Sequence, residues 1–586
     1  MPARFASLVA MLLAVHSLAA QTPWLGFANN PQHTAPAPAK SQSLAQIRWH
    51  TPVDLQPQYD GSELLIHYGS PLVTALNTVI VPVKTGVDGG FRVEARAAVD
   101  GSLKWSQTSD YILPEHDWTP AFGSTLTPAG RLYFPGAGGT VYYRDAPDSA
   151  AGPQGQLAFY GLANYSANRQ AYDASVMINT PLTSDAAGNL YFGFLLTGET
   201  PVPLSSGIAR IGANGAGTWI SAATAAADPA MTQIAFNCAP AISSDGKRLY
   251  VGVSDSNVGY LVALDSSTLA PVGRVRLQDP LSGRDAFLAD NASSSPTIGP
   301  DGDVYYGVLE NPDQANHARG WLLHFDALLA QTKTPGAFGW DDTASVVPAS
   351  IVPSYTGPSS YLLMTKYNNY AEAGGDGLNR LAILDPNAVM SDPVTGVRVM
   401  REVLTIASPT PDGPPPAVKE WCINSAVVDP ATHSVLAGNE DGKLYRWDLV
   451  TNSLSQTLVL TPGLGEAYTP TLIGGDGTVY AINNATLFAV GDATVTIATS
   501  PDSLSFSYLV GQASPSPQTL HITSNPSGLA VSVVPTCTWL VPSPAGGVTP
   551  LDSVISLNLA GLGPGSYSCS LTVTGPSGAS ASVRIR

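Results

Sequence analysis

Apolar positions alternate with polar ones over short runs in most of this chain, and turns that contain Gly separate the runs. Runs of this length, rich in Val, Leu and Tyr, predict β-strands. One phrase recurs: a small residue or Pro, a short apolar strand, a turn, and a second strand rich in Tyr and Val. Its copies begin at Ser70, Ser124, Thr180, Ala239, Ser295, Pro348, Ser425 and Thr469. Eight copies roughly 55 residues apart predict eight four-stranded blades, hence an all-β, eight-bladed β-propeller.

A Trp marks the fourth strand of several copies. The pattern G-x-x-x-W occurs in GSLKW (101–105), GAGTW (215–219) and GAFGW (336–340). The eighth copy stops near residue 492 without such a strand, whereas the early run LAQIRWHTPVD (44–54) has no hairpin partner beside it. Because an unpaired strand edge is a liability, we predict that strand 44–54 completes the eighth blade. Trp49 then takes the place that Trp105, Trp219 and Trp340 take in their blades.

The two ends of the chain differ from the repeats. Residues 1–20 combine an early Arg, a short apolar run and small residues before residue 21, which is typical of a secretory signal peptide. The propeller is expected over residues 21–492. From residue 493 the charge almost vanishes and strands alternate with Ser, Pro and Gly turns, which predicts a small β-sandwich of about 90 residues.

Charge and hydropathy exclude some classes of partner. Charged residues make up 12% of the chain and the net charge is −17, which argues against a surface that binds nucleic acid. We find no apolar run of the approximately 20 residues that a membrane span requires. The sequence therefore predicts a secreted protein, periplasmic or extracellular, and we expect a monomer.

The repeat resembles a known family. The runs ARAAVDGSLKW and ALDSST (263–268) are similar to pieces of the A-x-D-x-x-T-G-x-x-x-W repeat of quinoprotein-type propellers, and WLGFANNPQHTA (24–35) is similar to their lead-in. The resemblance implies a propeller in which each Trp docks one blade on the next. Dehydrogenases of this family carry pyrroloquinoline quinone with calcium. Their adjacent Cys-Cys pair is missing here. The C-terminal segment resembles immunoglobulin-like modules of the BACON type, an association that suggests glycan or surface contact.

Four isolated cysteines allow few pairings. Cys537 and Cys569 fall on two predicted strands of the C-terminal module, and export favours a disulfide between them; two buried thiols are the alternative. Cys238 and Cys422 precede inner strands of the fourth and seventh repeats, three blades apart. Whether they are bridged stays open.

Candidate ligand-binding residues lie in the loops that precede the inner strands, because these loops converge around the channel at one face of a propeller. The polar and aromatic residues of these loops are His116, Asp117, Trp118, Arg169, Asp173, Arg284, Asp341, Asp342, Glu420, Trp421 and Glu466. The alternative is that the charged groups solvate loop tips while each Trp packs beneath its loop. No metal site is predicted, since no third ligand can be named beside Asp341 and Asp342.

Standard catalytic motifs are missing from the sequence, including H-E-x-x-H, G-x-S-x-G and a phosphate-binding loop. We therefore predict a non-catalytic propeller, without a cofactor, that binds a polar small molecule, a glycan or a secreted protein at the channel mouth. The alternative is a quinoprotein-like oxidoreductase of alcohols or sugars, with pyrroloquinoline quinone and calcium as cofactors.

Overall fold

Two compact units divide the chain, one ending at Gly491 and one beginning at Asp492. The structure, a computed structural model, describes residues 21–586 except 62, 88, 115–121, 289–293, 464, 494 and 577–578. The signal peptide predicted for residues 1–20 lies outside these residues. Within them, no helix is long and apolar enough to span a membrane.

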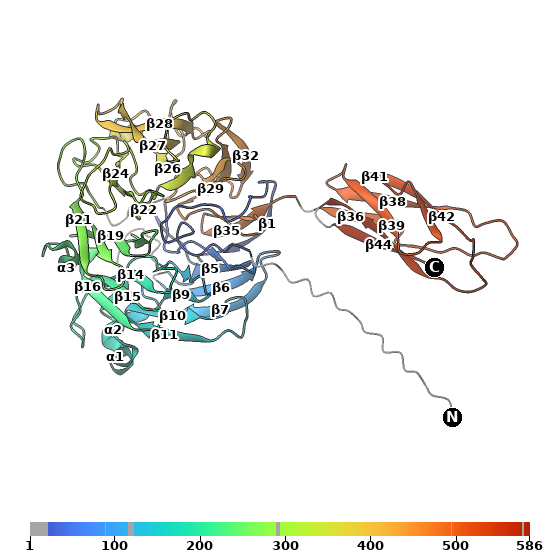
Figure 1. Cartoon of the computed structure of the whole chain (residues 1–586), viewed down its shortest axis with the longest axis horizontal. Helices are drawn as coiled ribbons and strands as arrows, with labels where there is room; N and C mark the ends of the chain where they lie inside the picture. The colour runs from blue at the N-terminus through green and yellow to red at the C-terminus, as the bar shows by residue number, and fades with distance from the viewer. Residues whose placement is uncertain are drawn as a thin grey trace. The chain divides into compact units, whose positions relative to one another are not determined.

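Eight antiparallel sheets form the first unit and follow one another around a ring (Figure 1). Blade 1 comprises β4 (Leu72–Val73), β5 (Thr78–Lys84), β6 (Phe91–Ala97) and β7 (Leu103–Ser109), and blade 2 comprises β8 (Thr125–Leu126), β9 (Leu132–Pro135), β10 (Thr140–Arg144) and β11 (Gln154–Ala158). Blade 3 comprises β12 (Val176–Ile178), β13 (Thr183–Ser184), β14 (Leu190–Leu196), β15 (Gly207–Ile211) and β16 (Gly217–Ser221). Blade 4 comprises β17 (Gln233–Ile234), β18 (Ala241–Ile242), β19 (Arg248–Ser254), β20 (Gly259–Asp265) and β21 (Pro271–Arg276).

Blades 5 to 8 complete the ring and confirm the predicted eight-bladed propeller. Blade 5 comprises β22 (Thr297–Ile298), β23 (Val304–Val308) and β24 (Trp321–Phe325), and blade 6 comprises β25 (Ser345–Pro348), β26 (Tyr361–Tyr367), β27 (Arg380–Ser391) and β28 (Arg398–Ala407). Blade 7 comprises β29 (Val427–Asp429), β30 (Ser434–Gly438), β31 (Lys443–Asp448) and β32 (Ser453–Val459). Blade 8 comprises β33 (Leu472–Ile473), β34 (Val479–Asn483), β35 (Thr486–Gly491) and β1 (Gln46–Pro52). A short hairpin, β2 (Gln58–Asp60) and β3 (Glu63–Leu65), follows β1.

Burial along each blade explains its sequence pattern. The second strands, such as β5 and β30, are buried at every position, because neighbouring blades cover both faces of each sheet. Outer strands such as β32 alternate between exposed and half-buried positions. Continuous Val, Leu and Tyr runs therefore occur in the middle of a blade, and mixed runs occur at its outer edge.

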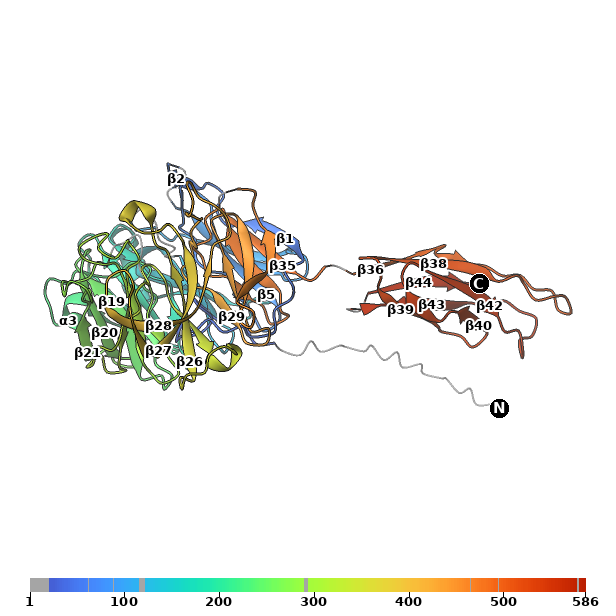
Figure 2. The ribbon, with the colours of Figure 1, turned by 90° about the horizontal axis from the view of Figure 1, so that it is seen from above.

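The N-terminal strand closes the ring as predicted. β1 pairs antiparallel with β35, and the two lie side by side in both views (Figures 1 and 2). Trp49 lies opposite Ala489, just as Trp105 lies opposite Ala95 and Trp219 opposite Ala209. The Trp49 indole N–H donates to the Ala98 carbonyl of blade 1 at 2.8 Å. This Trp thus docks the last blade on the first.

Trp340 does not share this position. Blade 5 has three strands among the described residues, and its outer segment contacts β24 only through isolated bridges at Gly336 and Thr332. The expected fourth strand at residues 336–340 is therefore wrong. The sixth repeat also starts earlier than predicted: its inner strand is β25, and the residues after Pro348 form a 3-10 turn, η3 (Ala349–Ile351).

Residues 24–37 fill the centre of the ring. Backbone N–H groups of inner strands donate to the carbonyls of Leu25, Pro31, Gln32, Thr34 and Ala35, from blades 2, 4, 5, 6 and 7 respectively. Trp24 pairs with Val73 of blade 1. The segment thereby satisfies polar groups on the inner edges of six blades, which water or a ligand would otherwise have to satisfy.

Helical segments are few and short. α1 (Leu162–Ala167) and α2 (Arg169–Asp173) lie between blades 2 and 3, and α3 (Ala222–Ala226) lies between blades 3 and 4. The Ser221 side chain caps α3 by accepting from the Thr224 N–H. Two further 3-10 turns are η1 (Ala137–Gly139) and η4 (Ala371–Ala373).

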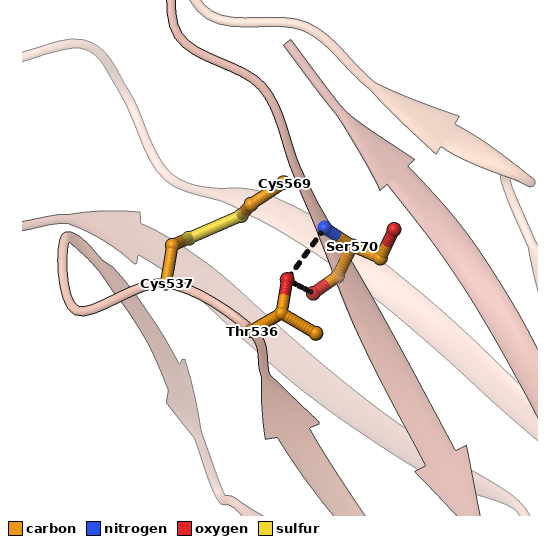
Figure 3. The surroundings of a disulfide bond; sticks show 4 residues. All are labelled: Thr536, Cys537, Cys569 and Ser570. Carbon is orange, nitrogen blue, oxygen red and sulfur yellow. Dashed lines mark hydrogen bonds between the residues drawn. A yellow bond between two sulfur atoms is a disulfide. The ribbon is translucent and has the colours of Figure 1, made fainter. Parts of the chain in front are cut away.

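The second unit is the predicted β-sandwich, with its own apolar core. One sheet has the order β36 (Thr496–Ser500), β38 (Gln518–Asn525), β42 (Leu551–Leu557), β40 (Leu540–Ser543); the other has the order β37 (Ser503–Leu504), β44 (Ser580–Ile585), β43 (Cys569–Thr574), β39 (Ala530–Pro535), β41 (Gly546–Val548). Cys537 and Cys569 form a disulfide, beside which Thr536 exchanges backbone and hydroxyl hydrogen bonds with Ser570 (Figure 3). Cys537 lies in the loop after β39, not on a strand as expected.

Candidate functional site at the channel mouth

Charged residues of blades 6, 7 and 8 meet at one mouth of the channel. Segments that precede inner strands start at this face, and second strands run back to it because each pairs antiparallel with its inner strand. Both sets of loops therefore meet there. We call the resulting group the acidic mouth, and it consists of Asp341, Asp342, Lys366, Glu420, Cys422, Glu440 and Glu466.

One buried ion pair anchors the acidic mouth. Lys366, near the end of β26, contacts the carboxylate of Asp341, and their side chains are 5% and 7% exposed. Burial by itself lowers the pKa of Lys366, but the carboxylates of Asp341 and Glu420 raise it above its usual value. Burial raises the pKa of Asp341 to about 6, against the pull of Lys366. The pair is thus ionised at neutral pH, with little water around it.

Asp342 is more deeply enclosed than Asp341. Its Oδ2 accepts hydrogen bonds from the Thr365 hydroxyl and from the Lys366 backbone N–H, the latter at 3.2 Å. None of the described groups donates to its Oδ1, which is fully buried. Burial raises the pKa of Asp342 to about 7. This carboxyl therefore titrates in the neutral range.

The remaining carboxylates surround a thiol. Cys422 Sγ and one carboxylate oxygen each from Glu440 and Glu466 all lie within 4.8 Å of one another. The Glu440 carboxyl hydrogen-bonds to Glu420, and burial followed by the charges of Glu420 and Glu466 raises the pKa of Glu440. Burial, then the nearby glutamates, also raises the pKa of Cys422, which is 4% exposed. Without a cation, the site therefore retains protons on these groups.

Neutral donors hold the rim of the site in place. Glu420 accepts hydrogen bonds from the Tyr370 hydroxyl and from the Asn368 amide, the latter at 2.8 Å. The Asn424 side chain donates to the Asp341 carbonyl and to the Tyr468 hydroxyl, both at 2.8 Å. These contacts tie the segments of blades 6, 7 and 8 together and fix the position of the carboxylates.

The other predicted ligand-binding residues lie elsewhere. Trp421 is fully buried in an apolar cluster and packs edge-on against Tyr445. Arg169, the first residue of α2, bridges Asp110 and Asp173 at 2.7 and 3.1 Å. Arg284 is exposed in the turn before blade 5. The structure thus brings together Asp341, Asp342, Glu420 and Glu466. His116, Asp117 and Trp118 lie outside the described residues.

Sequence reasoning missed Lys366 and Glu440, and it did not connect Cys422 with the carboxylates. Only the loops before inner strands were considered, whereas Lys366 and Glu440 come from second strands and the turns after them. A single Lys near the end of the mostly apolar run YLLMTKY was the available signal, because a buried Lys needs a carboxylate partner.

The channel itself is narrow beneath the mouth. A cavity of about 10 Å³, room for a single water, is lined by Phe27 and by residues just before several inner strands, among them Ser124, Asn237 and Asn424. Cys238 and Cys422 are both buried and unbridged. The described channel cavity therefore has no room for a ligand larger than a water molecule.

Comparisons with known proteins address the fold. No protein-family model and no curated protein matches this chain. Among solved structures, it is similar to a europium-containing methanol dehydrogenase, with 10% identity and a TM-score of 0.49 over 78% of this chain and 89% of that one. It is also similar to the quinohemoprotein alcohol dehydrogenase of Comamonas testosteroni, with 11% identity and a TM-score of 0.48 over 82% of each chain.

A quinohemoprotein alcohol dehydrogenase of Pseudomonas putida HK5 shares 12% identity, with a TM-score of 0.47 over 85% of this chain and 83% of that one. The computationally designed protein Ika8 also matches, with 11% identity and a TM-score of 0.38 over 77% of this chain and all of that one. Three of the four are named as methanol or alcohol dehydrogenases. Likenesses at these values carry no information on cofactor or reaction.

Proposed function

We propose that this protein is a binding protein whose ligand is a divalent transition-metal cation, held at the acidic mouth by Cys422, Glu440 and Glu466. The observation that carries the proposal is the convergence of one thiol and two carboxylates within 4.8 Å, a spacing that a single cation can bridge after small side-chain shifts. The three ligands come from the blade 7 and blade 8 segments, which backbone hydrogen bonds hold together: the Gly465 N–H donates to the Glu440 carbonyl at 2.9 Å.

The donor set selects among cations. A thiolate is a soft ligand that Ca²⁺ and Mg²⁺ avoid, whereas Zn²⁺ accepts sulfur and carboxylate oxygen together. Three protein ligands leave a tetrahedral ion one open position. An oxygen of a polar small molecule can occupy it, so the cation supplies a physical basis for the polar ligand expected from the sequence.

The charge balance of the acidic mouth also favours a cation. The acidic mouth contains five carboxylates and one ammonium group, that of Lys366, which already contacts Asp341. The neighbouring Lys419 contacts Asp412 at 2.9 Å, outside this group. Excess buried negative charge is costly unless protons or a cation neutralise it. A divalent ion replaces the protons of Glu440 and Cys422.

Calorimetric titration of the EDTA-treated full chain with Zn²⁺ and Ca²⁺ tests the proposal. We expect one Zn²⁺ per chain and weaker or no binding of Ca²⁺. Cys422→Ser and Glu440→Gln are expected to weaken Zn²⁺ binding at least tenfold, a loss of about 1.4 kcal/mol. Cys238→Ser, at the other buried thiol, and Glu372→Gln, at an exposed carboxylate, are the matched controls and should bind as the parent does. Equal losses in Cys422→Ser and Cys238→Ser contradict the site.

A quinoprotein-like oxidoreductase, the alternative from the sequence, matches the names of the solved structures better than a non-catalytic protein does. The donor set fits its cofactor poorly. Pyrroloquinoline quinone is a tricarboxylate, and the acidic mouth sets five carboxylates against one lysine, Lys366, that already contacts Asp341. The channel cavity of about 10 Å³ is also far smaller than a tricyclic quinone. The alternative therefore requires a bound cation before a quinone can approach.

Reconstitution with the quinone and Ca²⁺, then with the quinone and Zn²⁺, separates the two functions. The binding proposal expects no quinone absorbance after desalting and no dye-linked oxidation of alcohols or sugars in either case. A quinone band that survives desalting, together with dye reduction, establishes the oxidoreductase instead.

Export is part of the proposed function. The Cys537–Cys569 disulfide is typical of an oxidising compartment, which agrees with the leader predicted for residues 1–20. We expect a monomer that acts outside the cytoplasm, and gel filtration of the mature chain together with fractionation of the producing cells checks both points.

A further inference from the structure

The C-terminal sandwich contains a hollow that is lined by aromatic side chains. Its volume is about 580 Å³, within the range of small-molecule sites. Four parts of the chain form it: the residues after β37, the loop before β40, the end of β42 with the long connection to β43, and Arg586 after β44. The lining aromatic residues are Phe506, Tyr508, Trp539 and Tyr567. We call this hollow the sandwich cleft.

The disulfide braces the sandwich cleft. Trp539 follows Cys537 by two residues, and Tyr567 precedes Cys569 by two, so the bond ties together the two loops that carry these rings. The rings meet edge to face with centroids 6.3 Å apart. The Tyr567 hydroxyl donates to the Gly563 carbonyl at 3.0 Å, which fixes the orientation of that ring. The aromatic walls are therefore held in place before any ligand arrives.

Apolar groups at the cleft face solvent. Tyr508, Leu509 and Val510 are 41%, 73% and 67% exposed, and Tyr567 is 40% exposed. Such a patch next to a concave aromatic surface marks an interaction site, because leaving it in water is unfavourable. An apolar ligand body that enters the cleft removes this surface from water.

The polar groups that line the sandwich cleft indicate which class of ligand the cleft can bind. Ser507, Ser566 and Ser568 offer hydroxyls, and Arg586 is the charged residue among those that line the cleft. Carboxylate and amide side chains, which bind the ring hydroxyls of sugars in pairs, are missing from the described lining. A guanidinium beside aliphatic and aromatic walls instead complements a carboxylate on an apolar body.

We propose that the sandwich cleft binds an amphiphilic carboxylate, a molecule with one acidic head group and an apolar chain or ring. Its head group pairs with Arg586 and its body packs between Trp539 and Tyr567. This site stands apart from the acidic mouth and does not depend on the function proposed there. It also departs from the glycan contact that the resemblance of the C-terminal module suggests.

Fluorescence titration of the full chain with dansyl-undecanoate, under non-reducing and then under reducing conditions, tests the site. We expect saturable binding at micromolar concentration, displaced by dodecanoate. Trp539→Ala and Tyr567→Ala should each weaken it at least tenfold, whereas Tyr59→Ala, at a propeller tyrosine that is 52% exposed, should leave it unchanged. Tyr567 is exposed enough that its variant keeps the core; circular dichroism and the melting temperature verify the fold of each variant.

Two comparisons decide the ligand class and the role of the disulfide. Arg586→Gln should weaken the binding of dodecanoate roughly tenfold. It should leave the displacement of the probe by dodecanol unchanged, because the alcohol has no charge that pairs with Arg586. Reduction of the disulfide should weaken the binding of dansyl-undecanoate several-fold. Displacement by cello- or malto-oligosaccharides, or a titration curve that is the same for Trp539→Ala and the parent chain, overturns the proposal.

Discussion

Cys238 and Cys422 precede inner strands of blades 4 and 7, at similar places in the same repeat, and yet their surroundings differ. Cys238 accepts hydrogen bonds from the Gly252 N–H at 3.3 Å and from the Tyr306 hydroxyl at 3.7 Å. Burial raises its pKa to about 11, and no charged group contributes to this shift. Cys422 lies among three glutamates and near Lys366.

The difference between the surroundings of Cys238 and Cys422 indicates which positions of a repeat can carry a function. Both thiols are buried by the same blade packing, so burial alone does not distinguish a structural cysteine from a ligand. What distinguishes them is the content of the neighbouring loops: blades 6 to 8 bring carboxylates to the mouth, and the surroundings of Cys238 are neutral. Three changes sharpen or break this comparison.

The largest effect is expected from Lys366→Met. This change removes the ammonium group from a buried pair and leaves Asp341 without its partner, which should lower the free energy of unfolding by about 4 kcal/mol at pH 8. The loss should shrink at pH 5, because Asp341 can then bind a proton. Urea unfolding at the two pH values measures both numbers.

Lys84→Met is the control for that change. Lys84, at the end of β5 in blade 1, pairs at 3.2 Å with Asp54, which follows β1, and both side chains are fully buried. Its loss of stability should be similar, and its Zn²⁺ affinity should stay at the parent value, whereas Lys366→Met should alter that affinity. Identical Zn²⁺ binding in the two variants would mean that the charge of Lys366 has no part in the acidic mouth.

The sequence predicted much of the fold because the fold repeats. Eight copies of one phrase reveal blade number even when single copies are weak, and strand 44–54 was recognised by the missing strand of the last blade. The repeat failed where the chain departs from regular pairing. Residues 336–340 carry the G-x-x-x-W pattern, but β24 pairs with that segment only through isolated bridges. Local pattern cannot reveal such irregular tertiary contacts.

The candidate site was less predictable, because its parts come from segments that are distant in sequence. Glu466 meets Cys422 and Glu440 only after blade 8 has packed against blade 7. The sequence also did not predict that residues 24–37 fill the centre of the ring, because those residues pair with inner strands up to about 400 positions away. Predicting the loops at the mouth was possible, but predicting which charges they bring together was not.

The second change tests the titration of Asp342, a carboxyl group of the acidic mouth. The pKa of Asp342 is about 7 in the folded chain, above the value of an unfolded Asp, so its proton contributes stability below about pH 4 that is lost as the pH rises towards 7. Asp342→Asn cannot titrate and keeps an oxygen for the Thr365 and Lys366 donors. It should match the parent near pH 4 and exceed it by up to about 4 kcal/mol at pH 8. Urea unfolding in EDTA checks this; a constant difference across the range contradicts the burial of an ionisable carboxyl.

The smallest effect separates the two thiols in the metal-free protein. Cys238→Ala removes the acceptor of two buried donors, the Gly252 N–H and the Tyr306 hydroxyl, so it should cost about 1 kcal/mol beyond the lost packing of sulfur. Cys422→Ala removes a thiol to which none of the described groups donates a hydrogen bond, and it should cost the packing term alone. Chemical unfolding of both variants in EDTA gives the difference. If Cys422→Ala is the less stable of the two without metal, Cys422 contributes to the fold itself, and the contrast between a structural thiol and a ligand thiol fails.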